Sequence, residues 1–440
     1  MTSTRSSDLL RFFLFAYVIS VGFTDVLNLP LVGSKIQVPE IIFIPLLFTW
    51  IIHNFKDASI RNLLPGKLEL SILLYILVAA LSTIFNESTK SWLEVIGLIY
   101  LFGVYIVFKT SLKLIPDPAK FIRTAFISCG IVAALSAKFG WTLASNGIET
   151  ILAMPDDVNY PYLGHLARAT GFMDSPNMLF NLLAVCMLIY FPYFLGLSHK
   201  KITDYLILYI LAIGAILTFS KSILLLIIAL MYIFYKRKTI RKPFLQFSMT
   251  AIASFLFIIW ITGTHILVRK SSETDWSQGR EKGYTLSTPF AETGSFQLFK
   301  TNYLVNKESA IQAGKRNSIL GVGPGNFNQF VGRLKEEGLY PEYFINFDPH
   351  STYLGAFAEM GLIGLLGMMF LCYQIFLSLQ RTKTGIINRS FLISVNACFL
   401  FLALEAISMD ILNFRHVWIL IGVLSLSLHL PQNKPEPTSH

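Results

Sequence analysis

Apolar runs of membrane-spanning length recur along this chain of 440 residues and constrain its fold more than any other feature. A helix needs roughly 20 apolar residues to cross the hydrocarbon core of a bilayer. The runs are continuous rather than alternating, which favours helices over the strands of a membrane barrel. We therefore predict an all-α fold, a polytopic membrane helical bundle of about twelve spans. The runs lie near residues 9–29, 39–55, 68–86, 92–108, 121–144, 177–197, 203–219, 222–235, 244–263, 351–379, 389–405 and 413–430.

The spacing of these runs divides the chain into four parts. They are 1–263 with the first nine spans, 264–349 as a large periplasmic loop or cap, 350–430 with the last three spans, and 431–440 as a cytoplasmic tail. The cap segment is far longer than an ordinary connection, and such loops are commonly functional. Its mixed polar and aromatic composition predicts a small folded unit with helices near 297–314 and 326–338.

The formal net charge of +10 reflects the topology of the chain and needs no nucleic-acid partner. Basic residues gather in alternate short loops, all on one side if twelve spans are correct, which is the positive-inside pattern. This pattern places both termini in the cytoplasm and the cap on the other face. The four cysteines all fall within apolar spans, which argues against disulfides and against a thiolate metal site. They are Cys129, Cys186, Cys372 and Cys398.

His350 lies in the segment Asp348-Pro349-His350-Ser351, which opens the tenth span at the external surface. Polar residues at such a position are costly and are therefore candidates for function. The proline predicts a helix start, which puts His350 in the first turn with Tyr353 on the same side. A neutral imidazole there could take a proton from a sugar hydroxyl. The alternative is an interfacial histidine that reaches for the lipid headgroups.

Two external cations stand out near span boundaries. Lys221 separates two apolar runs with almost no loop, so its ammonium lies at the external surface or in a wet cavity. It suits a phosphate as a point charge, or it is a turn residue that reaches for water. Arg168 lies in an external loop just before the sixth span. Arg280 and Arg316 in the cap are similar, and a solvated surface charge is the commoner explanation for any of these arginines.

Three other patterns bear on the site. The turn Gly321–Asn326 precedes the second cap helix, either as a structural turn or as a run of amides that holds an anion. Asp410 and Arg415 flank the last external link and are predicted to form an ion pair. Asp348 and His350 have no second histidine or carboxylate at ligand spacing, so we predict no metal site. No motif indicates a nucleotide or another cofactor.

Four segments together resemble the O-antigen ligase and O-antigen polymerase superfamily. Leu217–Ser222 is similar to its T-x-S-R-S helix junction, and Arg168–Asn177 to its R-x-x-G-x-x-x-x-P-N element. Leu320–Phe327 resembles the family's G-V-G-x-G-x-F turn, and Pro349–Gly364 its P-H-N-x-Y-L…E-x-G-L-x-G segment. Each motif alone is weak, whereas four in the right order over residues 160–430 are specific.

This resemblance implies a glycosyltransferase of the bacterial inner membrane, with its site facing the periplasm. It would move a glycan from undecaprenyl diphosphate to a hydroxyl acceptor, lipid A core or another glycan, without metal or nucleotide. By the resemblance, His350 is the catalytic residue and Lys221 contacts the diphosphate. Arg168 and Tyr353 are expected in the same substrate-binding set.

Two departures from the family pattern concern the cations. The family usually has arginine where this chain has Lys221, and lysine keeps the charge but loses the bidentate fork. The family also often carries an arginine about eighteen residues before the glycine turn. Here that position is near Tyr303, so the second cation is expected to be Arg280 or Arg316.

Two alternatives remain open from the sequence. A polymerase of the same superfamily would join the glycan to another carrier-linked chain, and the sequence does not distinguish it from a ligase. A flippase or transporter for the lipid-linked glycan would carry charged residues throughout the bundle interior. Here the polar candidates concentrate at the external end, which favours the enzyme.

Overall fold

The computed structural model describes residues 2–26, 36–56, 66–86, 88–160, 164–237, 243–270, 289–341, 348–381 and 389–429. Most of these residues are helical. The helices are α1 (Thr2–Ser20), α2 (Val38–Lys56), α3 (Lys67–Asn86), α4 (Thr89–Ser111), the short 3₁₀ helix η2 (Leu112–Leu114), α5 (Pro118–Ser145), α6 (Pro176–Gly196), α7 (Ile202–Ile216), α8 (Ile223–Lys236), α9 (Pro243–His265), α10 (Asn302–Arg316), α11 (Phe327–Glu336), α12 (Thr352–Arg381), α13 (Arg389–Glu405) and α14 (Arg415–His429).

Each of the twelve predicted apolar runs overlaps a helix, namely α1 to α9 and α12 to α14. Within the described residues, six helices are long and apolar enough to cross a membrane: α3, α4 with η2, α5, α6, α9 and α12. The helical membrane fold is thus confirmed, and the number of crossings stays a prediction. Local sequence sets several helix starts. Asp117 and Ser175, each followed by proline, accept the amides of Lys120 and Met178 at the starts of α5 and α6.

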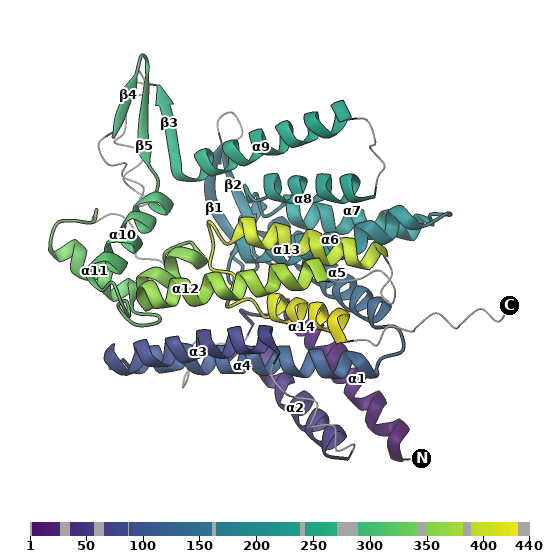
Figure 1. Cartoon of the computed structure of the whole chain (residues 1–440). Helices are drawn as coiled ribbons and strands as arrows, with labels where there is room; N and C mark the ends of the chain where they lie inside the picture. Colours follow the sequence, from purple (N-terminus) through teal and green to yellow (C-terminus); the bar gives the residue numbers. More distant parts are fainter. Residues whose placement is uncertain are drawn as a thin grey trace.

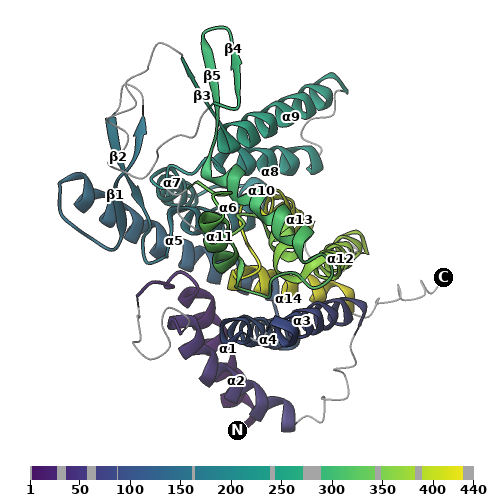
Figure 2. The same ribbon diagram turned by 90° about the vertical axis from the view of Figure 1, so that its left-hand side faces the viewer.

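Most helices lie side by side, and the bundle has two distinct ends (Figure 1). Helices α10 and α11 lie at one end, whereas α1 begins and α14 ends at the other. This arrangement fits an even number of crossings between the start of α1 and the end of α14. Figure 2 views the molecule from the end that carries α10 and α11 and shows α6 lying among the other helices.

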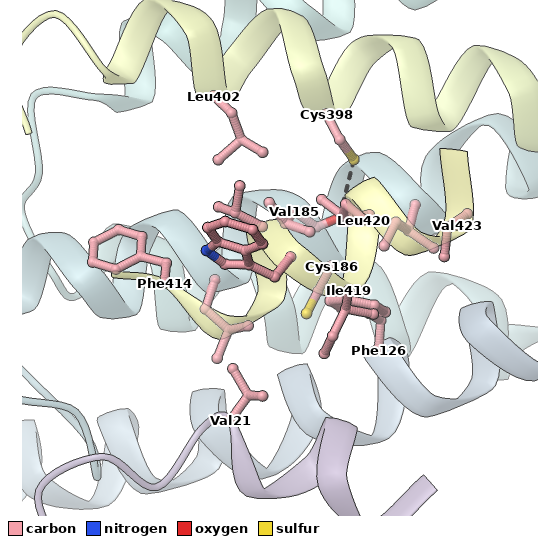
Figure 3. Packing of buried hydrophobic residues seen from close by; sticks show 14 of the residues in the cluster. Val21, Phe126, Val185, Cys186, Cys398, Leu402, Phe414, Ile419, Leu420 and Val423 are labelled. Atoms are coloured by element: carbon pink, nitrogen blue, oxygen red, sulfur yellow. Dashed lines mark hydrogen bonds between the residues drawn. The ribbon is translucent and has the colours of Figure 1, made fainter. Parts of the chain in front are cut away.

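The core of the bundle gathers apolar side chains from α5, α6, α13 and α14. Figure 3 shows Phe126, Cys186, Leu402 and Leu420 converging there, and Cys398 lies 3.9 Å from the carbonyl of Val185. Three of the four cysteines are buried, and all four are free thiols. They act as small packing residues, as their positions within the apolar runs predicted.

Two small antiparallel sheets depart from the all-α prediction. In the link between α5 and α6, β1 (Ala153–Tyr160) pairs with β2 (Gly164–Ala169). In the cap, β3 (Ile266–Lys270), β4 (Ala291–Thr293) and β5 (Phe296–Lys300) form a sheet of order β3-β5-β4, which projects from the end of α9 (Figure 1). The predicted helix near 297–314 was therefore wrong in its first turn, because β5 pairs there with β3, a partner outside the window. The two cap helices are otherwise present as α10 and α11.

The glycine turn attaches the cap to the bundle. Gly361 has φ 65° inside α12 and opens a kink, into which the turn inserts. The amides of Val322 and Gly323 donate to the carbonyls of Ala358 and Glu359 at 3.0 and 2.9 Å. A Cβ on Gly321, which has φ 68°, would lie 2.3 Å from the backbone of Glu359. The structural alternative for this turn is therefore correct, because α12 already occupies these two amides.

Candidate functional site

His350 lies just before the start of α12 and outside the helix. Its φ of 47° is left-handed, and α12 begins two residues later, so the predicted first-turn position is wrong. Asp348 accounts for this conformation, because its carboxylate accepts the backbone amide of His350 at 2.7 Å and lies 3.0 Å from the ring Nδ1. These two contacts close a tight local loop that a helix could not make.

The same carboxylate sets the chemistry of the His350 ring. When Nδ1–H donates to Asp348, Nε2 carries the lone pair that can accept a proton. Burial acts to raise the pKa of Asp348, but the hydrogen bonds and charge of His350 hold that pKa below its usual value. The ring of Tyr303 lies against the imidazole, with 4.5 Å between the ring centroids. His350 is thus oriented on two sides.

Lys221 and Arg168 come together from two separate segments. Arg168, on β2, donates from Nε to the carbonyl of Thr218 at 2.8 Å and from Nη2 to Asn177 at 3.0 Å. Ser220 donates to the same Asn177 side chain at 3.1 Å. The R-x-x-G and T-x-S-K-S segments therefore form one unit, in which the exposed Lys221 ammonium donates to the carbonyl of Gly263 at the end of α9. Partial burial and the charge of Arg168 lower the pKa of Lys221.

The structure adds a cation that sequence reasoning missed. Lys307 on α10 is only 8% exposed, and its ammonium donates to Nε2 of His265, the last residue of α9. The other ring nitrogen of His265 lies 2.6 Å from the carbonyl of Ile261, so it carries the proton and His265 is neutral. Burial lowers the pKa of Lys307 to about 8. Among the described residues no carboxylate pairs with Lys307.

Lys307 and His265 line a cavity at this end of the bundle, and His350 directly precedes Ser351, which also lines it. Tyr303 and Lys307 are four residues apart on α10 and so share one face, which links His350 to Lys307. His265 lies within electrostatic reach of both Lys307 and Lys221. The cavity has a volume of about 450 Å³. It is lined by Lys307 and His265 together with Ile261, Thr262, Ile266, Leu304, Ser351, Tyr353, Leu354 and Ile407.

Of the remaining predicted site residues, one lines the cavity, one lies far from it and one is outside the described part of the chain. Tyr353 lines the cavity and donates its hydroxyl to the carbonyl of Ala403 at 3.1 Å. Arg316 makes a bidentate pair with Glu337 at 3.0 and 2.8 Å. It lies at the far end of α10 from Tyr303, roughly 20 Å away at 1.5 Å per residue. Arg280 lies outside the described residues.

The predicted ion pair between Asp410 and Arg415 is wrong. Arg415 pairs with Glu40 of α2 at 2.7 Å, 375 positions away in sequence. Asp410 instead accepts from Thr352 at 3.3 Å and from Asn413 at 3.1 Å, next to the start of α12. Arg415 therefore joins α14 to α2, and Asp410 helps to hold the segment that follows His350.

Comparison with protein families agrees with this geometry. Residues 206–369 match the family model described as O-antigen ligase. This segment belongs to the O-antigen ligase superfamily. The match includes Lys221, Lys307, the glycine turn and His350, and Arg168 lies outside it. A comparison with curated proteins finds no match.

Membership and fold together define the protein in broad terms. It is a multi-pass membrane protein that carries an O-antigen ligase domain. At the level of the superfamily, such a domain indicates a glycosyltransferase-like enzyme that works on glycans and lipid-linked donors.

Proposed function

We propose that this O-antigen ligase superfamily member transfers a glycan from undecaprenyl diphosphate to a hydroxyl of lipid A core. The reaction takes place at the periplasmic face of the inner membrane. The acceptor oxygen attacks the sugar carbon that carries the diphosphate, the carbon–diphosphate bond breaks, and undecaprenyl diphosphate leaves. The acceptor proton passes to His350. No nucleotide is needed, because the energy lies in the carrier bond.

Lys307 is the observation that carries this proposal. A buried ammonium is costly unless an anion compensates it. Lys307 contacts a neutral imidazole instead, and no carboxylate within the described part of the chain pairs with it. Such an arrangement is suited to an anion supplied by the substrate, and a diphosphate fits this requirement. Lys307 takes the role of second cation that was expected of Arg280 or Arg316.

Three cations would share the charge of the leaving group. Lys307 contacts His265, and Lys221 contacts Gly263, two residues earlier on α9. Arg168 braces the Lys221 segment through Thr218. Charge that develops on the diphosphate during bond cleavage is stabilised by cations that are already in position. These side chains can supply the charge neutralisation that a divalent ion provides in other phosphate chemistry. We therefore propose a metal-independent reaction.

His350 would act at the acceptor side. Asp348 and Tyr303 hold the imidazole, so that Nε2 can meet the acceptor hydroxyl, as an aspartate holds the histidine of a catalytic triad. General base catalysis of this kind contributes about 10²–10⁴-fold to a rate. A polymerase of the same superfamily would use the same donor chemistry with a different acceptor. The groups proposed to act on the substrate gather at one end of the bundle, as a transferase requires.

The test is complementation of a strain that lacks this protein with His350→Ala. We expect loss of at least about 10²-fold in transfer, with normal insertion of the protein in the membrane. The lipopolysaccharide ladder distinguishes the acceptors. Loss of all O-chain with accumulation of carrier-linked polymer indicates a ligase, whereas a single-repeat band indicates a polymerase.

His199→Ala is the matched control, because His199 is an exposed histidine in the link between α6 and α7, at the other end of the bundle. Its ladder should be that of the unchanged protein. A normal ladder in a fully inserted His350→Ala variant would remove His350 from the reaction. Activity that disappears on treatment with a metal chelator would contradict the metal-independent mechanism.

A further inference from the structure

The three-stranded sheet that follows α9 has one face of apolar side chains. Side chains directly opposite each other on paired strands, or two residues apart on one strand, point to the same face of a sheet. The register pairs Val268 with Leu298, and Leu298 with Ala291. Phe296 lies on the same face, two residues before Leu298. We call this the Val268 face. Val268 is 56% exposed and Phe296 is 43% exposed.

The opposite face of the sheet is polar where it is exposed. Glu292 is directly opposite Gln297 and accepts its side-chain amide at 2.9 Å. Phe299 lies on this face closer to α9 and is only 4% exposed. An antiparallel sheet commonly packs its apolar face on a core and turns its polar face to water. Here the exposed apolar side chains gather on the Val268 face, which is therefore suited to an apolar partner.

The position of the sheet indicates what this partner is. β3 begins at Ile266, directly after α9 ends at His265. In Figure 1 the strands run across the direction of the long helices and lie beyond the end of α9. Figure 2 looks at the end of the bundle that carries α10 and α11, and there the sheet extends past the outline of the helices. If the helices cross a membrane, the strands therefore run along the membrane surface beside the bundle.

Lipid is the medium that surrounds the helix from which the sheet emerges. Only 6% of the apolar window of α9 is buried, the smallest share among the six candidate spans in the described residues. Phe255 and Ile258 of this helix are 62% and 56% exposed. A sheet that continues from such a helix and extends sideways lies over the lipids next to it. This continuity favours a bilayer over a protein as the partner of the Val268 face.

We propose that the Val268 face rests on the bilayer beside α9 and inserts Val268 and Phe296 at the boundary between headgroups and acyl chains. The partner is the lipid surface as a whole, as for amphipathic elements that lie in the plane of a membrane. β5 leads into α10 through Thr301, whose hydroxyl donates to the carbonyl of Thr264 at 2.9 Å. The sheet thus fixes the position of α10, with Lys307, relative to the membrane surface.

The test measures how lipid and water reach single nitroxide labels on the full-length protein in phosphatidylcholine nanodiscs. Cys372→Ala removes the cysteine that is not buried, and a label is then attached to Val268→Cys or to Phe296→Cys. Power saturation compares collisions with oxygen, which dissolves in lipid, and with a water-soluble nickel chelate. We expect both labels to favour oxygen, at a depth of about 5–10 Å.

Glu292→Cys is the matched control, because Glu292 is exposed on the opposite face of the same sheet. Its label should favour the nickel chelate. Labels at positions 268 and 296 that favour the chelate would overturn the proposal, since the face would then lie in water. Labels shielded from both reagents would also overturn it and would indicate a covering protein, such as a second copy of this chain. Oxygen preference at all three positions would contradict the assignment of the faces.

A charge on the Val268 face sharpens this result. Val268→Asp should lower the oxygen preference of the label on Phe296→Cys, because a carboxylate is costly at that depth. Glu292→Lys changes a charge on the other face and should leave that preference unchanged. An unchanged preference in Val268→Asp would contradict contact with lipid. If one labelled variant does not fold, the other decides the question. These measurements need no transfer, so their outcome is independent of the proposed function.

Discussion

Two buried lysines of this protein differ in what compensates their charge. Lys109 on α4 is 5% exposed, and its ammonium donates to Glu69 of α3, which is also 5% exposed. Tyr105 donates to the same carboxylate and lies 2.9 Å from Ser425 of α14. Lys307 on α10 is 8% exposed, but among the described residues its ammonium contacts the neutral ring of His265 and no carboxylate. The first lysine has its counter-ion within the fold, whereas the second has none among the residues that the structure describes.

This difference separates a structural charge from a binding charge. The Lys109 cluster ties three helices together and leaves no charge for a ligand to neutralise. Lys307 lies at the opposite end, beside a cavity and near His350, where an external anion could approach. Burial alone therefore does not identify a lysine that binds a ligand. What distinguishes the two lysines is whether the contacting side chain is a carboxylate or a neutral ring.

The largest expected effect is on stability at the Lys109 cluster. Lys109→Met leaves Glu69 buried without its partner, which should cost about 3–5 kcal/mol of unfolding free energy. The measurement is denaturant or thermal unfolding in detergent micelles. The double variant Lys109→Met/Glu69→Leu removes both charges and should recover most of this loss. Equal stability of the single variant and the unchanged protein would show that the pair is not structural.

Lys307→Met should have the opposite result, with stability retained and transfer lost. It replaces an uncompensated ammonium with an apolar side chain of similar length, so stability should be unchanged or higher. Transfer should fall by about 10²–10³-fold, the loss typical of a missing electrostatic contact in a transition state. Both quantities are measured on one preparation. If the variant loses stability but transfers normally, Lys307 is a structural charge, as Lys109 is.

The pH dependence of transfer gives a smaller and more specific effect. Burial lowers the pKa of Lys307 to about 8, so its ammonium is present below that pH and is lost above it. The value of kcat/KM should therefore fall above about pH 8, approaching tenfold per pH unit. Lys307→Arg should shift this fall beyond the measurable range, since arginine stays charged. An unchanged profile in that variant would assign the titration to another group.

The smallest effect is expected at Arg316. This exposed arginine is paired with Glu337 at the far end of α10 from the cavity, so Arg316→Ala should leave transfer unchanged. Lys221→Ala is the informative partner for this measurement. It removes an exposed cation that lies beside the cavity, and should lower transfer by roughly tenfold or more. Equal activity of the two variants would remove Lys221 from the site.

Several features of the site could be predicted because they depend on local sequence. The segments around Arg168, Lys221 and His350 carry short motifs, and the structure brings the first two together through Asn177. The position of His350 near a span boundary also followed from the apolar run that begins beside it. The left-handed conformation of His350 could not be predicted. A proline before a histidine indicates a helix start, and the contacts of Asp348 that oppose it are known only from the structure.

Lys307 shows why the second cation could not be found from the sequence. It lies in a polar cap segment, Asn302–Arg316, where lysine is ordinarily a solvated residue. Its burial depends on α9 and α12 packing against α10, and these helices are distant in sequence. One signal was available, since Lys307 lies one helical turn beyond Tyr303, the position where the family pattern expects an arginine. Arg316 was a weaker choice, because Glu337 holds it elsewhere.

The sequence by itself determined the membrane helices, since each apolar run must form a helix to satisfy its own backbone hydrogen bonds in lipid. It also determined the short motifs that name the superfamily. The tertiary structure decided everything that depends on distant partners, including the strands of the cap, the pairing of Arg415 with Glu40, and the insertion of the glycine turn into α12. It also decided which buried lysine has a counter-ion. A helix can be predicted from one window of sequence. Whether a buried lysine has a counter-ion depends on residues that are distant in the sequence and come together only in the fold.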